Sequence, residues 1–254
     1  MARQSYALTY PQLVLQAVRK NYDEASLVRL RRAQEAALRL LDGFYRAQDT
    51  PFICHLTRTA SIAMEHGASV DTVLAALLHA VYMFGIFRDG KAGGMTEAHR
   101  REIRNQFGEQ VDGLIADYMK LKFHEMDFLK ATLESCATLS RRERDVLLIG
   151  LSNELEDYLD LQMVFRRGAR YKEAIEKNGP LMIGLAKALG HASLAEELSA
   201  AFQNSLRSSV PDAAKCDRLG AYEQAEHFRM RRGRLRIFLS RIKQLVLHKL
   251  FIQR

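Results

Sequence analysis

Apolar residues recur at spacings of three and four along most of the chain, which is the period of an amphipathic helix. Only four prolines interrupt the pattern, and no long stretch alternates between apolar and polar positions as strands do. The pattern predicts an all-α protein, with helices over residues 10–20, 24–47, 51–66, 71–84, 96–107, 109–120, 125–136, 141–165 and 170–179, and two more between 180 and 205.

Several of these predicted helices carry recognisable ends. Asp71 and Thr96 each precede a helical run and suit an N-cap position, and Pro51 suits a first helical position. Gly67 and Gly190 follow helical runs and indicate helix stops. These residues support the predicted boundaries independently of the apolar spacing.

Two segments lack helical periodicity. Residues 85–95, GIFRDGKAGGM, are rich in glycine and predict a connector or lid, although a lysine beside glycines also occurs in phosphate-binding loops. Residues 204–220 are polar and predict a linker. We therefore expect a helical domain over 1–203, the linker, and a C-terminal segment over 221–254.

The positive charge of the chain is concentrated in that last segment. The formal net charge is +8, from 38 Lys and Arg against 30 Asp and Glu. Residues 229–254 hold nine of the basic residues and no acidic one, so the rest of the chain has 29 against 30, or about −1. Any attraction to polyanions is therefore expected from the tail alone.

The tail is predicted to form a basic amphipathic helix. Apolar residues follow helical spacing on one face: Leu235, Phe238, Leu239, Ile242, Leu245 and Val246. Such a helix suits an anionic membrane surface, or docking on its own domain or on a partner protein. Nucleic acid ranks third as a partner, because the tail lacks interleaved aromatic residues and a known module.

Composition favours a cytoplasmic protein. The tail adds membrane-peripheral attachment as an alternative. No window approaches the roughly 18 unbroken apolar residues that a membrane-spanning helix requires. The first twenty residues lack the apolar core of a signal peptide. The three cysteines stand far apart without metal-binding spacing, which fits a reducing compartment.

Candidate chemistry is concentrated in three of the predicted helices. PFICHLTRTASI (51–62) contains His55, and AALLHAVYMFG (75–85) contains His79. The third segment, DVLLIGLSNELEDYLDL (145–161), presents a dense acidic face. If these helices converge, they bring two imidazoles next to carboxylates.

The converging groups allow three interpretations. His55 and His79 form part of a helical core, or line a metal-free ligand pocket as hydrogen-bonding and acid–base groups, or bind a divalent metal. A metal site would use His55, His79 and Asp157 and would suit Mn, Fe or Zn. Asn153 lies one turn before Asp157, so both side chains are expected on the same helix face.

An anion-binding pocket is the alternative to a metal site. Tyr82 lies three residues after His79, and Arg58 three after His55, so each pair shares a helix face. A cluster of tyrosine, histidine and arginine can bind a small anionic ligand, with the guanidinium providing a planar pair of donors. The alternative roles are packing for Tyr82 and a surface ion pair for Arg58.

These segments, in this order, resemble the HD-domain superfamily, and specifically the hydrolase domain of RelA/SpoT-type (p)ppGpp enzymes. The family pattern runs from an arginine-containing lead-in to PYxxHP, then ALLHDVxED, then a KxADRLHN helix. Here Arg46 with PFICHL, then ALLHAVYMF, then IGLSNELED occupy these places, over roughly residues 30–200. The resemblance implies an HD-domain-like helical bundle and places Arg46 at a nucleotide-contacting position.

The residues that carry the family's chemistry differ. Both metal-binding histidines match, but the paired aspartate of His-Asp is Ala80 and the later aspartate is Asn153. The acidic pair that activates water corresponds to Met83 and Phe84. Because two carboxylate ligands and both acidic helpers are absent, the resemblance implies no cofactor, with a divalent metal as the alternative.

A second resemblance is to uncharacterised bacterial and plant proteins derived from the HD fold. These carry His-Ser or His-Ala in place of His-Asp, followed by an aromatic residue and a glycine, as in HAVYMFG here. The resemblance implies a role beside glycan or specialised-metabolite biosynthesis.

The sequence thus predicts a noncanonical HD-fold protein that has lost the metal phosphohydrolase site. It is expected to bind a small anionic ligand as a pathway accessory or metal-free enzyme. His79, His55 and Tyr82 are the candidate catalytic residues, and the candidate ligand-binding residues are Arg46, Arg58, Asn153 and Asp157. The alternatives are a metal-dependent hydrolase or oxygenase with a rebuilt site, and a membrane-peripheral scaffold protein.

Overall fold

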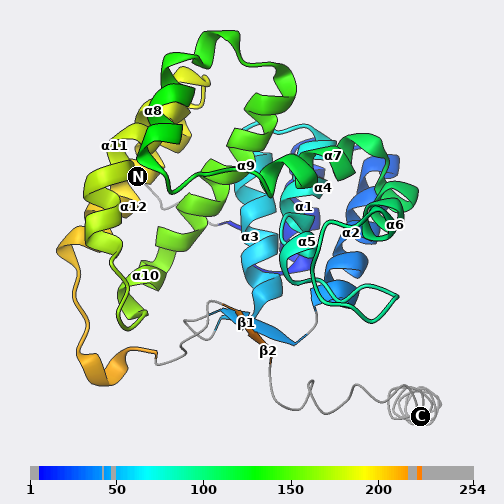
Figure 1. Ribbon diagram of the computed structural model, residues 1–254, viewed down its shortest axis with the longest axis horizontal. Coiled ribbons are helices and arrows are strands. Elements are labelled where there is room, and N and C mark those ends of the chain that lie inside the picture. Colours follow the sequence, from blue (N-terminus) through cyan, green and yellow to red (C-terminus); the bar gives the residue numbers. More distant parts are fainter. Residues whose placement is uncertain (1–5, 42, 47–49, 217–221, 225–254) are drawn as a thin grey trace.

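The computed structural model describes residues 6–41, 43–46, 50–216 and 222–224 (Figure 1). These residues are mostly helical, so the predicted all-α fold is confirmed. The elements are α1 (Tyr10–Arg19), α2 (Glu24–Leu41), β1 (Phe44–Arg46), α3 (Phe52–Glu65), α4 (Val70–Leu78), α5 (Val81–Phe84), α6 (Glu97–Phe107), α7 (Glu109–Tyr118), α8 (Met126–Glu134), α9 (Arg141–Tyr158), α10 (Gln162–Phe165), α11 (Tyr171–Ala188), α12 (Ala192–Arg207) and β2 (Tyr222–Gln224), with short 3₁₀ turns at Cys136–Thr138, Leu159–Leu161 and Asp212–Ala214.

Helix α3 lies in the middle of the bundle, with α4 on one side and α9 on the other (Figure 1). One hydrophobic cluster joins α1 to α7 with part of α9, and a second joins α8, α9, α11 and α12. Every residue from His55 to Met64 is buried. Polar side chains on this helix must therefore find partners inside the protein, because an unpaired buried polar group is costly.

The predicted helix ends at three positions are confirmed. The Thr96 hydroxyl accepts a hydrogen bond from the backbone N–H of His99 at 3.2 Å and caps α6. Gly67 and Gly190 have φ of +80° and +92°, a backbone conformation that side chains rarely adopt. Helix α4 begins at Val70 with Ser69 as its cap, just ahead of the predicted start at Asp71.

The helix predicted over 24–47 is wrong beyond Leu41. Gly43 has φ of +78° and turns the chain out of α2. The next three residues form β1, which pairs antiparallel with β2 far along the chain. Arg46 therefore lies on a strand at the end of the bundle, at the foot of α3 (Figure 1).

The helix predicted over 71–84 is interrupted beside His79. The imidazole Nδ1 donates to the carbonyl of Ala76, in the last turn of α4, at 2.7 Å. Ala80 then has φ of −97° and ψ of 0°, and its carbonyl accepts from Met83 and Phe84 to begin α5. His79 thus stands at the end of a helix, where its ring projects from the C-cap position.

The helix predicted over 141–165 ends instead at Tyr158. Asp160 and Leu161 have φ of 54° and 60°, so the chain leaves the helical conformation and starts again as α10. The side-chain amide of Gln162 donates to the carbonyl of Glu156 at 2.9 Å and closes the end of α9. This contact joins two helices that the apolar spacing had merged.

The break predicted between Gly179 and Pro180 is absent, because α11 continues through the proline to Ala188. Proline inside a helix costs about 3 kcal/mol. The buried side chains before and after it pack against α12, and Gly179 leaves room for this contact. A β-carbon at Gly179 would lie 3.2 Å from Cδ2 of Phe202.

The predicted linker begins later than expected, because α12 extends to Arg207. At the start of the predicted tail, residues 222–224 form β2; the rest, 225–254, lies outside the described residues. Its amphipathic helix and its membrane or protein partners stay predictions. None of the described helices is long and apolar enough to cross a membrane.

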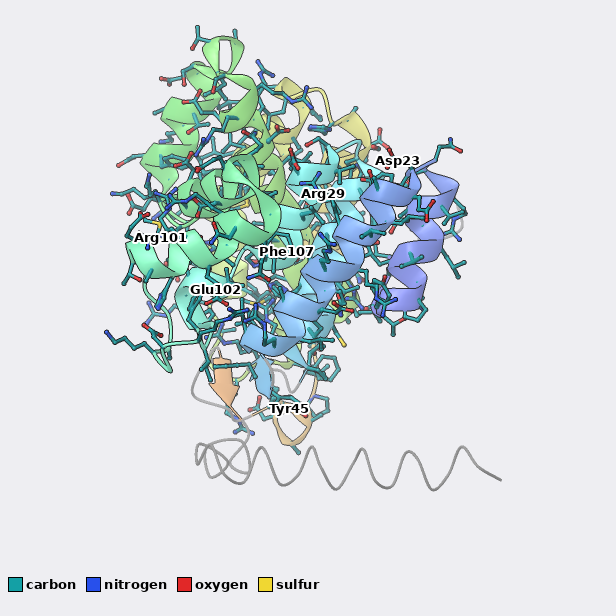
Figure 2. All side chains as sticks on the ribbon, turned by 90° about the vertical axis from the view of Figure 1, so that its right-hand side faces the viewer. Asp23, Arg29, Tyr45, Arg101, Glu102 and Phe107 are labelled. Carbon is teal, nitrogen blue, oxygen red and sulfur yellow. The ribbon has the colours of Figure 1, made fainter. Side chains whose placement is uncertain are left out.

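Two arginines of α2 contact α6: Arg39 binds Glu102, and Arg29 reaches the end of the helix (Figure 2). Arg29 of α2 pairs with Asp71 at 2.5 Å and reaches the carbonyl of Phe107, at the end of α6, at 3.5 Å. This contact ties the outer helices to the beginning of α4, the helix that carries His79 at its other end.

Candidate functional site

Two buried histidines meet between α3 and α4. His55 is 0% exposed and His79 is 2% exposed, and their Nε2 atoms lie 3.4 Å apart. Phe52 stacks on the ring of His55, and Tyr118 meets the ring of His79 edge-on. The aromatic walls keep water away from both imidazoles, so their protonation is controlled by neighbouring protein groups.

His79 is held as a neutral imidazole. Its Nδ1 faces the Ala76 carbonyl, an oxygen that only accepts, so Nδ1 carries the proton and Nε2 carries a lone pair. Burial, with a further contribution from His55, lowers the pKa of His79 to about 3. The lone pair of Nε2 therefore points toward His55 at neutral pH.

His55 is oriented by a carboxylate on α9. Its Nδ1 lies 2.5 Å from Oε2 of Glu156, and both side chains are almost fully buried. A proton on Nδ1 is donated to this carboxylate, and a proton on Nε2 is donated to Nε2 of His79. Burial and the guanidinium of Arg46 hold the pKa of His55 well below its usual value, so the ring is neutral near pH 7. Its Nε2 faces the Nε2 lone pair of His79.

Arg46 reaches into this cluster from β1. Its Nη1 donates to Oε2 of Glu156 at 3.0 Å and lies 2.5 Å from Nδ1 of His55, while Nη2 pairs with Asp157. The arginine side chain is only 8% exposed. Nη1 thus contacts both the carboxylate and the imidazole, and one guanidinium pairs with two carboxylates beside His55.

Arg58 lies on the other side of Glu156. Its Nη2 pairs with Asp160 at 2.8 Å, and its Nη1 lies 3.9 Å from Oε1 of Glu156. Gln162 donates to the same Oε1 at 2.9 Å. The centre therefore holds two guanidinium groups and three carboxylates around a pair of neutral imidazoles.

The structure places the other two predicted site residues differently. The hydroxyl of Tyr82 donates to Asp112, which also binds Arg100, so its described hydrogen bond leads away from the histidines. Asn153 is half-buried, and no described contact involves its side chain. The roles predicted for Tyr82 and Asn153 stay predictions, whereas the other five predicted residues converge.

Glu156 was missed as a site residue, although it binds both His55 and Arg46. The available signal was its place on the buried face of α9, four residues after the buried Ser152 and one after Leu155. A carboxylate on an apolar stripe indicates a buried partner, because isolated charges are rarely buried.

Among the described residues, the groups that could hold a metal ion differ from the predicted ligands. His55, Glu156 and Asp157 each offer a ligand atom, and these atoms lie within 4.8 Å of one another. The predicted set had His79 in place of Glu156. In the described structure, the guanidinium of Arg46 contacts all three of these residues.

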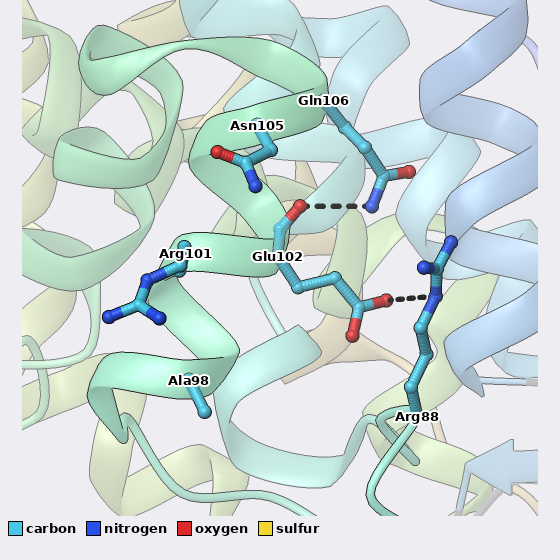
Figure 3. A pocket seen from close by; sticks show the side chains of 6 residues that line it. All are labelled: Arg88, Ala98, Arg101, Glu102, Asn105 and Gln106. Atoms are coloured by element: carbon cyan, nitrogen blue, oxygen red, sulfur yellow. Dashed lines mark hydrogen bonds and ion pairs between the residues drawn. The ribbon is translucent and has the colours of Figure 1, made fainter.

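The glycine-rich loop 85–95 forms its own contacts apart from the histidines. The N–H groups of Gly93 and Gly94 donate to the carbonyls of Gly85 and Tyr82, so they are engaged within the protein. Beside the loop, a shallow groove of about 340 Å³ lies against α6 (Figure 3). Its central Glu102 lies 3.7 Å from Arg88.

Acid is expected to weaken the fold through the buried histidines. The pKa of His79 is about 3 in the folded chain and near 6.5 when unfolded, so the unfolded chain binds more protons between these values. The contribution is complete above pH 6.5 and declines as pH falls toward 3. In denaturant titrations, the free energy of unfolding of His79→Asn should fall less steeply with decreasing pH than that of wild type. The difference in slope should be about 1.4 kcal/mol per pH unit between the two pKa values.

Asparagine suits this test because its amide can still donate to the Ala76 carbonyl. His124→Gln is the matched control, since the His124 side chain is 80% exposed. Equal acid sensitivity in wild type and His79→Asn would contradict the neutral assignment of His79.

Comparison with known proteins finds a family match and a similar solved structure. Residues 33–139 match the HD domain family. A solved structure described as "A metazoan ortholog of SpoT hydrolyzes ppGpp and plays a role in starvation responses" is similar at 21% identity, with a TM-score of 0.48, over 72% of this chain and 97% of the other. A search of curated proteins found no match. The similarity to the HD domain family thus lies in residues 33–139, less than half of the 254-residue chain.

Proposed function

We propose that this protein uses its HD-fold centre without the divalent metal and binds a small anionic ligand beside Arg58. The observation that carries the proposal is the position of Arg46. Its guanidinium contacts His55, Glu156 and Asp157, the group of residues best arranged to bind a cation. A fixed side-chain cation in this place supplies the positive charge that an ion would otherwise bring.

A divalent metal fits the remaining residues poorly. Two Nε2 atoms 3.4 Å apart match one edge of a tetrahedral site with metal–nitrogen distances of about 2.1 Å. Among the described residues, however, no third histidine, cysteine or carboxylate forms a compact group with both imidazoles. An ion held by two neutral ligands would lack charge compensation.

The low pKa of His79 favours binding over catalysis as the role of the centre. An efficient general base has a pKa near the working pH, and a base with a pKa of about 3 accepts protons weakly. The two neutral imidazoles instead complete the buried polar network beside Arg58.

Arg58 is the cation that an anionic ligand can reach. It lines a pocket of about 320 Å³ together with Thr50, Cys54, Asp160 and Gln162. The partner of Arg58, Asp160, is 56% exposed, so its carboxylate can move into water at little cost. A phosphate or carboxylate can then replace Asp160 as the acceptor for the guanidinium.

The ligand test uses inorganic phosphate and pyrophosphate as probes, with calorimetry and melting temperature as readouts. Asp160→Asn removes the internal competitor and should raise affinity by about fivefold to tenfold, equivalent to about 1 kcal/mol. Arg58→Ala should abolish binding. The control is Arg31→Ala, which removes an arginine from an exposed pair with Glu35.

The pattern across variants decides the outcome. Binding that survives in Arg58→Ala, or equal affinity in wild type and Asp160→Asn, would refute an anion site at Arg58. No binding of either probe to Asp160→Asn, in which Arg58 is released, would also contradict it.

A further inference from the structure

A second cavity lies between α9 and the helix pair α11 and α12. It encloses about 110 Å³ and is lined by residues that include His124, Glu154, Asp157, Asn178, Met182 and Phe202. Of the residues that form the histidine centre, only Asp157 lines this cavity. It is therefore separate from the pocket beside Arg58.

Asn178 leaves a buried acceptor at this cavity. The side chain is 5% exposed, and its Nδ2 donates to the carbonyl of His124 at 3.0 Å. Its Oδ1 is buried and has no hydrogen-bond partner among the described residues. A buried carbonyl oxygen without a donor is uncommon in native proteins and indicates an unseen water, ion or ligand.

Glu154 adds a second acceptor without a close donor. It is 5% exposed, and its nearest basic group is Nδ1 of His124 at 3.7 Å, on a side chain that is 80% exposed. The groups that influence its charge are Asp157 and Tyr158 on α9, His124 before α8, and Arg46 on β1. Burial, followed by repulsion from Asp157, raises the pKa of Glu154 to about 8.

The rest of the cavity wall is apolar. Met163, Ile175, Met182 and Phe202 line it, and methionine side chains adapt readily to the shape of a ligand. The cavity thus combines two carboxyl groups and an unpaired amide oxygen with a hydrocarbon surface. A ligand that matches both parts carries N–H donors, a positive charge and a short alkyl chain.

We propose that this cavity binds a small primary alkylammonium ion, with Asn178 Oδ1 and the Glu154 carboxylate accepting its N–H groups. The alkyl chain lies against the methionines and Phe202. The site is independent of the proposed anion site, since neither Arg58 nor the imidazoles take part.

The experiment uses n-butylammonium as the probe and 1-butanol as a neutral molecule of similar shape, both titrated into the full chain by calorimetry. We expect n-butylammonium to bind at least about tenfold more tightly, because a charged donor meets a carboxylate.

Three variants locate the site. Glu154→Gln keeps the shape of the side chain but removes its charge, and should lower n-butylammonium affinity about tenfold. Asn178→Leu removes the second acceptor and should also weaken binding. Glu134→Gln changes an exposed glutamate on α8 and should bind as wild type does. Melting temperatures confirm that each variant is folded.

The proposal is overturned if n-butylammonium does not bind to wild type, if 1-butanol binds equally well, or if Glu154→Gln retains full affinity. Arg58→Ala should leave n-butylammonium binding unchanged. Failure of the anion site can therefore be distinguished from failure of this one.

Discussion

Replacing Arg46 with methionine should lower the free energy of unfolding by about 3–5 kcal/mol, because removing one partner leaves buried charges uncompensated. Glu156, 1% exposed, and Asp157 would each lose their contact with the guanidinium. Methionine occupies similar space without charge, so the change isolates electrostatics from packing. Urea titration followed by circular dichroism measures the loss.

The same variant should acquire a metal site. His55, Glu156 and Asp157 would keep ligand atoms within 4.8 Å of one another, with no arginine among them. We expect added Zn²⁺ or Mn²⁺ to raise the melting temperature of Arg46→Met and not that of wild type. Elemental analysis of untagged wild type purified without chelator should find far less than one Mn, Fe or Zn per chain.

The control is the double variant Arg46→Met with Glu156→Gln. Removing both charges should recover part of the lost stability and weaken the acquired metal binding. Stoichiometric metal in wild type would refute the proposal that Arg46 replaces the ion. An Arg46→Met variant as stable as wild type would contradict the described ion pairs.

Replacing Asp112 with leucine should cost about 3 kcal/mol of stability, near the lower end for a broken buried ion pair. Asp112 is 0% exposed, and Arg100 binds its carboxylate through Nε and Nη2. The side chain of Arg100 is 31% exposed, so after the change it can still reach water. The hydroxyl of Tyr82 cannot reach water. Its pKa is raised mainly by burial and then by Asp112.

A double-mutant cycle with Tyr82→Phe separates the two contacts. The single change Tyr82→Phe should cost about 1–2 kcal/mol, the typical value for a hydrogen bond to a charged group. In the Asp112→Leu background, the same change should cost little or improve stability. Thermal and urea unfolding of the four proteins give the coupling energy.

The cycle also tests the catalytic role predicted for Tyr82. Loss of phosphate or pyrophosphate binding in Tyr82→Phe without loss of stability would show that the hydroxyl serves the ligand. A stability loss with unchanged binding would assign the hydroxyl to the fold. Glu109, an exposed acid near Arg104, provides a control: Glu109→Gln should change stability by less than about 1 kcal/mol.

Much of the fold was predictable because helices are made from local interactions. Apolar spacing predicted an all-α chain, and local chemistry marked Thr96 as a cap and Gly67 and Gly190 as stops. The boundaries failed where a tertiary contact outweighed local preference. Pro180 remains inside α11 because the flanking residues are buried against α12, a contact that is not visible in the segment itself.

The candidate site also has a part that local sequence predicted and a part that it did not. The sequence by itself determined that His55 and His79 lie on helices that come together, because the order and spacing of the segments resemble those of a known domain. It did not determine what stands beside them. Arg46 and Glu156 are 110 residues apart in the chain, and Arg46 was predicted to lie on a helix.

Only the tertiary structure decided that Arg46 leaves α2 at a glycine turn, joins a two-stranded ladder and places its guanidinium between α3 and α9. The physical reason is that local spacing fixes which face of a helix is apolar, whereas the partner of a buried charge is fixed by packing between distant segments. Tyr82 shows the same limit, since its place beside His79 in sequence did not indicate that its hydroxyl would turn to Asp112.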